Sequence, residues 1–219
     1  MRPAVIVLVL AAASIALSAY PRVDIAASAM FHCRGEEPWC HRRAQPWDWL
    51  YRWGPLPGVA CGVAGVGLAI GGTLRHRPRL RTAGLFLATT ILIGPGLLGN
   101  SIKPFWGRPR PRQIVQFGGQ REYTPVWRPD PSRRGTSFPS GHVATAFSVG
   151  STALLVPHPA ARTAIIVGSL AYGGLMGLAR MAQGAHFASD VAWSATFAWV
   201  AILLSARLTL KRLPGGSGR

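Results

Sequence analysis

The sequence predicts an all-α protein in which a single domain, residues 1–219, crosses a membrane with six helices. Two observations predict this fold class. Apolar residues make up 49% of the chain and charged residues only 14%, a proportion that is low for a soluble protein. The charged residues gather in loops between long apolar runs, and this distribution is typical of a polytopic membrane protein.

The formal net charge of +17, with only seven acidic residues, indicates an anionic partner. Nucleic acid, anionic lipid and a phosphate-bearing substrate all fit such a balance. The basic residues do not form one stripe but are divided among several short loops between the apolar runs. We therefore expect no nucleic-acid partner, and contact with membrane lipids or with a phosphate group instead.

The apolar run at residues 4–20 has two interpretations. It is either the first membrane helix or a cleaved signal peptide, because Ala16-Leu17-Ser18 resembles a small-residue cleavage site. We favour the helix, since further spans follow, and both interpretations place residue 21 outside the cytoplasm. The aromatic-rich segment 21–54 is expected at the lipid headgroups, where Trp and Tyr rings are favoured.

That segment also holds two of the three cysteines, Cys33 and Cys40. They form a disulfide if the segment faces an oxidising compartment, or they remain two thiols, and the sequence leaves both possibilities open. His32 and His41 adjoin them, but a compact ligand pattern is missing, so we expect no zinc site.

Two further spans are expected at residues 55–73 and 83–101. The first is rich in glycine and alanine, which allow close helix contact in a bilayer. The second is interrupted by Pro95, and a kink is tolerated there if neighbouring helices re-satisfy the backbone. The loop between them, residues 74–82, carries four arginines and is expected on the cytoplasmic side.

The remaining spans are expected at residues 143–157, 163–178 and 191–210, which leaves both termini in the cytoplasm. Helix parity then puts two polar connections, residues 102–142 and 179–190, on the outer face of the membrane. The longer connection is strongly basic, which is unusual for an outside loop. We accept this conflict because the positive charges have a second use, the binding of an anion.

Three polar patches lie at these outer ends. The first contains Lys103 and Arg110, with Arg108 between them, in a proline-rich stretch whose stiff backbone fixes the cations in advance. Guanidinium grips phosphate oxygens in a bidentate fork, while lysine acts as a point charge. Taken alone, this patch fits a basic segment that touches anionic headgroups equally well.

The second patch is Ser140, Gly141 and His142, at the entry to the fourth expected span. Free backbone N–H groups at a helix N-terminus bind anions, and glycine allows a ligand to approach closely. The serine hydroxyl donates a further hydrogen bond, and the histidine holds or releases a proton near neutral pH. A helix-capping serine beside an interfacial histidine is the alternative.

The third patch contains Arg180, His186 and Asp190. If the sixth helix begins near Ala185, His186 and Asp190 share one face of it. A carboxylate beside an imidazole fixes its tautomer and turns the other ring nitrogen outward as a nucleophile. An ordinary ion pair is the alternative, but all three patches fall on one side of the membrane, where ionisable groups are usually functional.

Together the patches resemble the type 2 phosphatidic acid phosphatase (PAP2) superfamily. Its pattern is Lys, six residues and Arg-Pro; then Pro-Ser-Gly-His; then Ser-Arg, five residues, His, three residues and Asp. The matching residues here are Lys103 with Arg110-Pro111, then Pro139 to His142, then Arg180, His186 and Asp190. Ala179 departs from the pattern, which has Ser there, and this removes a hydroxyl donor but no charge. The resemblance begins near the third span, and residues 1–80 fit in topology only.

The resemblance implies a PAP2-type helical core and a role for each matching residue. His186 is the implied nucleophile, which forms a phosphohistidine, and Asp190 orients it. His142 is the implied acid for the leaving alkoxide and then the base that activates water. The implied phosphate ligands are Lys103, Arg110, Ser140, Gly141 and Arg180. Neither a metal nor another cofactor is implied, and the sequence lacks a carboxylate cluster for magnesium.

The implied activity is hydrolysis of a lipid phosphate or pyrophosphate monoester by a bacterial inner-membrane protein whose site faces the periplasm. Candidate substrates are undecaprenyl pyrophosphate, phosphatidylglycerol phosphate, phosphatidic acid and the phosphates of lipid A. We expect the arginines between Arg121 and Arg134 to select a large anionic headgroup, and we expect no obligate protein partner. Phosphotransfer between lipids by the same residues, and a non-catalytic lipid-binding or transport protein, are the alternatives.

Overall fold

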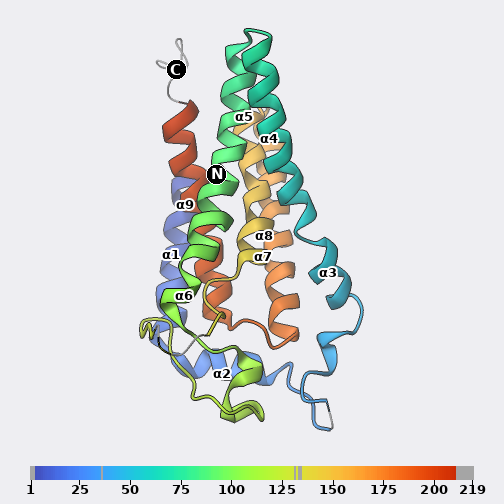
Figure 1. Ribbon diagram of the computed structural model, residues 1–219, viewed down its shortest axis with the longest axis vertical. Coiled ribbons are helices and arrows are strands. Elements are labelled where there is room, and N and C mark those ends of the chain that lie inside the picture. The colour runs from blue at the N-terminus through green and yellow to red at the C-terminus, as the bar shows by residue number, and fades with distance from the viewer. Residues whose placement is uncertain (1–2, 36, 131, 133–134, 211–219) are drawn as a thin grey trace.

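Helices packed side by side make up this computed structural model, which describes residues 3–35, 37–130, 132 and 135–210 (Figure 1). Within those residues the regular structure is helical, apart from two isolated β-bridges, Gly107–Gly135 and Ile114–Arg121. The all-α fold that the sequence predicts is therefore confirmed.

The bundle is built from long helices, with shorter helices gathered at one end. The long ones are α1 (Pro3–Ala19), α4 (Leu56–Leu74), α5 (Pro78–Ile91), α8 (Pro159–Ala182) and α9 (Ala188–Thr209), and the shorter α7 (Gly141–Ser148) lies among them. Two of them continue with another pitch, α5 as the π-helix η2 (Leu92–Ser101) and α7 as the 3₁₀-helix η6 (Val149–Leu155). The short ones are α2 (Pro21–Ala29), η1 (Cys40–Arg42), α3 (Trp47–Trp53), α6 (Lys103–Trp106), η3 (Pro111–Gln113) and η4 (Val115–Phe117).

The membrane spans differ in part from the six that the sequence predicts. Four helical stretches of the described chain are long and apolar enough to cross a membrane, namely Trp47–Leu74, Pro78–Trp106, Pro159–Ala182 and Ala188–Thr209. The count becomes five if α1 and α2, which meet at 89°, are one broken span. The span expected at residues 143–157 corresponds to α7 and η6, which are short, so length and composition do not confirm six.

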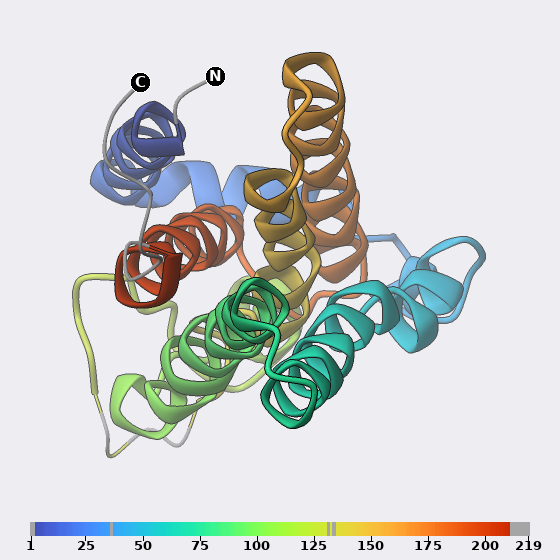
Figure 2. The same cartoon turned by 90° about the horizontal axis from the view of Figure 1, so that it is seen from above.

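The short α7–η6 segment lies in the middle of the bundle, among α5, α8 and α9 (Figure 2). Val143 and Ala146 are fully buried there, and Phe147 packs against the same core. A helix that is apolar on all sides is stable when protein surrounds it. The apolar side chains of α7 therefore pack against protein rather than lipid, and the N-terminus of α7 is held at a fixed point inside the bundle.

Close helix contact at small residues is clearest between α4 and α5. A Cβ atom added to Gly84 would stand 2.2 Å from the backbone nitrogen of Ala69, and one added to Gly72 would stand 2.3 Å from that of Arg81. The backbones of the two helices therefore touch, as the glycine-rich composition predicts. The Pro95 interruption coincides with η2, because proline lacks the N–H that a regular α-helical ladder needs.

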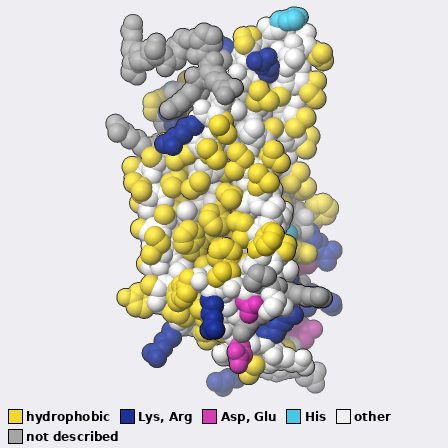
Figure 3. All heavy atoms as spheres, turned by 60° about the vertical axis from the view of Figure 1, so that its left-hand side comes forward, with side chains coloured by type: hydrophobic (Ala, Val, Ile, Leu, Met, Phe, Trp, Pro, Cys, Tyr) yellow, Lys and Arg dark blue, Asp and Glu magenta, His cyan; other side chains and the backbone are white. Residues whose placement is uncertain are grey.

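Charged side chains separate to the two ends of the molecule. Figure 3 shows a broad band of hydrophobic side chains around the middle, with Lys, Arg, Asp and Glu below it. The α4–α5 hairpin lies at the upper end in Figure 1, while α2, α3, α6 and the long connection that follows α6 lie at the lower end. The basic loop expected in the cytoplasm and the connections expected outside are thus at opposite ends.

Candidate active site

The three polar patches meet at the lower end of the bundle. Lys103 begins α6, Ser140 is the residue just before α7, and Arg180 lies in the last turn of α8. A Cβ atom added to Gly141 would stand 3.6 Å from the ammonium nitrogen of Lys103, so the first and second patches adjoin. Parts of the chain that are far apart in the sequence are therefore brought to one place.

His186 has a single orientation. It is 3% exposed, and its Nδ1 atom lies 2.5 Å from the backbone carbonyl oxygen of Ser137. A carbonyl oxygen only accepts a hydrogen bond, so Nδ1 carries the proton and Nε2 keeps its lone pair. Burial, and then the charges of Arg180 and Lys103, lower the pKa of His186 to about 4 against the opposing effect of Asp190. The ring is neutral at neutral pH, with Nε2 able to act as a nucleophile.

Asp190 acts on His186 through other groups rather than through a direct hydrogen bond. Its Oδ2 atom is 3.8 Å from Nδ1 of His186, and it accepts hydrogen bonds from the Ser137 hydroxyl at 2.6 Å and from the Phe187 N–H at 2.9 Å. The Asp190 carboxylate therefore fixes both Ser137 and Phe187, the two residues that position the imidazole.

The start of the last helix also differs from the expectation. A start near Ala185 would put His186 and Asp190 on one helical face, but α9 begins at Ala188. The Phe187 N–H is taken up by the Asp190 carboxylate, which caps the helix from its first turn. His186 therefore lies in the connection before α9, in the region where the three polar patches meet, which we call the pocket.

Ser140, Gly141 and His142 form the N-terminus of the central helix. The Ser140 N–H donates to the Ser194 hydroxyl at 2.8 Å, which ties α7 to α9. The Ser140 hydroxyl is buried and has no hydrogen-bond partner among the described residues. A buried donor without a partner is costly, and a ligand oxygen would satisfy it.

His142 lies among the cations of the other two patches. Burial, and then the charges of Arg180, Lys103 and Arg110, lower its pKa to about 4. Its ring stacks on that of Tyr51 from α3, with centroids 5.2 Å apart, and the guanidinium of Arg180 lies 4.6 Å from the centre of the same Tyr51 ring. Tyr51 thus contacts both the imidazole and the guanidinium and holds them in place.

Among the cations of the motifs, two have a buried hydrogen-bond donor that no described residue accepts. The Nε–H groups of Arg110 and Arg180 are buried without a partner in the described part of the chain. Lys103 contacts the side-chain oxygen of Asn100 at 3.3 Å, and Gln183 accepts a 2.5 Å hydrogen bond from Arg180. The unsatisfied groups of this pocket are all donors of the kind that bind phosphate oxygens.

Arg108 has a different place from the one that its position between Lys103 and Arg110 suggests. It is 0% exposed and lies between the carboxylates of Asp190 and Asp24, the latter at 2.7 Å. It also donates to the Ser189 hydroxyl at 2.9 Å and to the Thr124 carbonyl at 2.8 Å. A buried guanidinium with every partner in place is a structural group, not a phosphate ligand.

Asp24 and Tyr51 are neighbours of the site that the sequence motifs do not include. Asp24 lies on α2, is 2% exposed, and accepts hydrogen bonds from both the N–H and the hydroxyl of Ser189. An acidic residue inside an apolar helix was the available signal, because such residues are usually paired and functional. Tyr51 gave no signal beyond being one of several aromatic residues near the membrane surface.

The structure also decides between the alternatives left open for the cysteines. Cys33 and Cys40 form a disulfide at the same end of the molecule as the pocket. Together with His41 they make up the one group of three potential metal ligands found in the described chain, and two of its sulfurs are bonded to each other.

Comparisons with known proteins give a consistent result. A sequence profile of the PAP2 superfamily matches residues 83–214. A lipid A 4'-phosphatase of Francisella tularensis subsp. novicida (strain U112) is 32% identical over 128 residues, 58% of each chain. Lipid A 4'-phosphatases of Rhizobium leguminosarum and Rhizobium etli are each 36% identical, over 53% and 52% of this chain and 51% and 43% of their own lengths.

The chain therefore spans about half the length of the curated relatives it matches. No solved structure matches it. The profile match covers more than half of the chain and includes all three polar patches, and the protein accordingly belongs to the PAP2 superfamily.

Proposed function

We propose that this protein hydrolyses the phosphate monoester of a membrane lipid, with His186 as the nucleophile. The observation that carries the proposal is the set of buried, unpartnered donors on Ser140, Arg110 and Arg180 beside the free Nε2 atom of His186. A phosphate group placed among these donors would satisfy them and present its phosphorus atom to the imidazole.

The proposed reaction has two steps. In the first, Nε2 of His186 attacks phosphorus, and the bond to the lipid oxygen breaks while His142 passes to that oxygen the proton that the phosphate monoanion brings in. In the second, His142 takes a proton from water, the water oxygen attacks phosphorus, and the P–N bond breaks. Inorganic phosphate leaves with the proton that His142 took from water, and both imidazoles return to their neutral starting states.

The other residues stabilise charge during these steps. The ring of His186 becomes positive when it carries phosphate, and the Asp190 carboxylate at 3.8 Å offsets that charge. Lys103, Arg110 and Arg180 offset the negative charge on the transferring group. Because these cations supply the positive field, we expect phosphate release to continue in EDTA.

We propose a lipid A type phosphate as the substrate class, on the similarity to the three lipid A 4'-phosphatases. The location that goes with it is a bacterial inner membrane, with the pocket on the periplasmic side. Two observations support that side: the arginine-rich α4–α5 loop lies at the opposite end, and a disulfide, which is formed in oxidising compartments, lies at the pocket end.

Phosphate release from lipid A by the detergent-purified protein tests the proposal. The His186→Ala variant should lose activity by at least about a thousandfold, since the nucleophile is gone. His158→Ala is the matched control, because His158 is exposed and caps α8 at the opposite end. Wild-type turnover by the His186→Ala variant would overturn the assignment, and a phosphorylated acceptor lipid in place of free phosphate would make the protein a phosphotransferase.

A further inference from the structure

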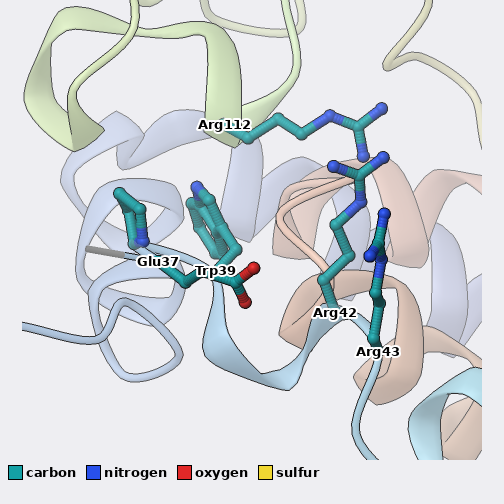
Figure 4. A pocket seen from close by; sticks show the side chains of 6 residues that line it. Glu37, Trp39, Arg42, Arg43 and Arg112 are labelled. Atoms are coloured by element: carbon teal, nitrogen blue, oxygen red, sulfur yellow. The ribbon is translucent and has the colours of Figure 1, made fainter. Parts of the chain in front are cut away.

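A second group of cations lies beside the pocket and has no part in the proposed reaction. Figure 4 shows the guanidinium groups of Arg42, Arg43 and Arg112 pointing toward one another. Arg42 and Arg43 come from η1 and the residue after it, and Arg112 comes from η3. We call these three residues the arginine cluster. Together with Glu37, Pro38 and Trp39 they line a cavity of about 180 Å³.

Positive charge exceeds negative charge in this cavity, where Glu37 is the one acidic side chain among the described lining residues and faces three arginines. Among the described residues, none of the guanidinium groups of the arginine cluster makes an ion pair, and the neighbouring Asp48 is paired with Arg52 at 2.8 Å. Burial, and then the charges of Arg110 and Arg42, lower the pKa of Arg112 to about 10. Like charges held this close repel one another, and a bound anion removes that repulsion.

The arginine cluster is continuous with the phosphate pocket. A second cavity of about 210 Å³ is bordered by the whole cluster and also by Arg110 and Arg180, two of the proposed phosphate ligands. A ligand with one anionic group on Arg110 and Arg180 therefore extends directly toward the cluster. The Cys33–Cys40 disulfide ties down the segment that carries Arg42, so the cluster is held in place before the ligand arrives.

We infer that the arginine cluster is a second anion site, which binds another phosphate group of the same lipid headgroup while the first is hydrolysed. The inference rests on the proposed function, because it needs a phosphorylated lipid in the pocket. Three guanidinium groups suit a phosphate dianion, which accepts several bidentate hydrogen bonds. Arg42 and Arg43 lie outside residues 83–214, the range that the family profile matches, whereas Arg112 lies inside it.

The test compares two substrates, a diglucosamine lipid with two phosphate groups and the same lipid with only the 4'-phosphate. For the wild-type protein we expect kcat/KM to be roughly ten- to a hundredfold higher for the lipid with two phosphates, because charge-assisted hydrogen bonds to the second group are added. In the Arg42→Ala/Arg43→Ala double variant, the ratio of the two kcat/KM values should fall to near one.

Arg75→Ala/Arg79→Ala is the matched control, since it removes the same charge from the opposite end of the molecule. It should keep the wild-type ratio. An equal kcat/KM for both lipids in the wild type, or an unchanged ratio in the Arg42→Ala/Arg43→Ala variant, would overturn the second site while leaving the phosphatase proposal standing. If the wild type releases phosphate from neither lipid, the proposed function itself is wrong.

Free inorganic phosphate distinguishes a headgroup site from a site for a separate anion. Added to the assay with the singly phosphorylated lipid, it should act only as a competitive inhibitor. If it instead raises kcat/KM to the value for the lipid with two phosphates, the arginine cluster binds free phosphate and the inference about the headgroup is overturned.

Discussion

Arg108 links the N-terminal part of the chain to the proposed catalytic residues. Its two carboxylate partners, Asp24 and Asp190, are both buried, and Asp190 in turn accepts hydrogen bonds from Ser137 and Phe187, which adjoin His186. Removing one partner of a buried ion pair lowers stability far more than replacing both partners by apolar residues, because the remaining charge stays buried. Asp24 is thus a positioning residue that acts through Arg108 and Ser189.

The Asp24→Asn variant should be less stable by about 3 kcal/mol, because a buried guanidinium loses one of its carboxylates. Asp48→Asn is the control, since Asp48 pairs with an Arg52 side chain that is 65% exposed, and surface pairs contribute about 0–1 kcal/mol. Thermal unfolding in detergent measures both. Equal melting temperatures for the two variants would contradict the role given to the buried network.

The pH dependence follows from the two imidazoles. His186 must be neutral to attack, and its pKa is lowered to about 4, so kcat/KM should rise through about pH 4 rather than through the ordinary value of 6.5. One further proton, on His142 or on the phosphate, is needed for the leaving oxygen, and a phosphate monoester loses its last proton near about pH 6. We therefore expect kcat/KM to fall above about pH 6. A rise of kcat/KM through about pH 6.5, the ordinary pKa of histidine, would contradict the assignment of His186 as the neutral nucleophile.

The contact between α4 and α5 shows how helix packing depends on single glycines. Gly84→Ala should lower stability by about 1–3 kcal/mol, because the new methyl group meets the backbone of Ala69 at 2.2 Å. Gly67→Ala is the control on the same pair of helices, since nothing lies within 4 Å of its added Cβ. The melting temperature should fall for the first variant and not for the second. An equal fall in both would mean that the helices do not touch as described.

Most helices could be predicted from the apolar runs, because a long apolar run bounded by charged loops is typical of a membrane-spanning helix. The exceptions have physical causes. The span predicted at residues 143–157 stays a prediction, because α7 is buried among other helices and hydropathy does not distinguish protein from lipid. α9 begins at Ala188, between the assumed start near Ala185 and the span predicted at 191–210, and this start depends on the Asp190 cap, a contact between one side chain and one N–H group.

The residues of the proposed site also fall into two groups, those that the sequence motifs predict and those that they do not. The residues of the three motifs could be found from their spacing, and the structure brings them to one end of the bundle. Tyr51 and Arg42 could not, and Asp24 is marked only by its charge, because these residues reach the site through contacts with residues far along the sequence, as Asp24 does with Ser189. Residues 1–80 fit the family in topology only, yet they supply these neighbours. The predicted role of Arg121 to Arg134 in headgroup selection stays a prediction, with Arg133 and Arg134 outside the described residues.

The orientation of the whole molecule has its own test. In a Cys61→Ser background, a cysteine introduced by Gln116→Cys should react with a membrane-impermeant maleimide in intact spheroplasts, because Gln116 is exposed in η4 at the pocket end. A cysteine introduced by His158→Cys, at the opposite end, should react only after the membrane is broken. The reverse pattern would place the pocket in the cytoplasm.

The central claim is that one phosphoryl group is held between two imidazoles and passes through His186. Rapid quenching of the His142→Ala variant with an aryl phosphate, followed by mass spectrometry, tests it most directly. The aryl leaving group needs no proton, so the first step should proceed, while the second step lacks its base and the phosphoenzyme should accumulate. We predict phosphate on His186, and none when His186→Ala is added. Turnover without phosphate on His186, or with phosphate on another residue, would contradict the account.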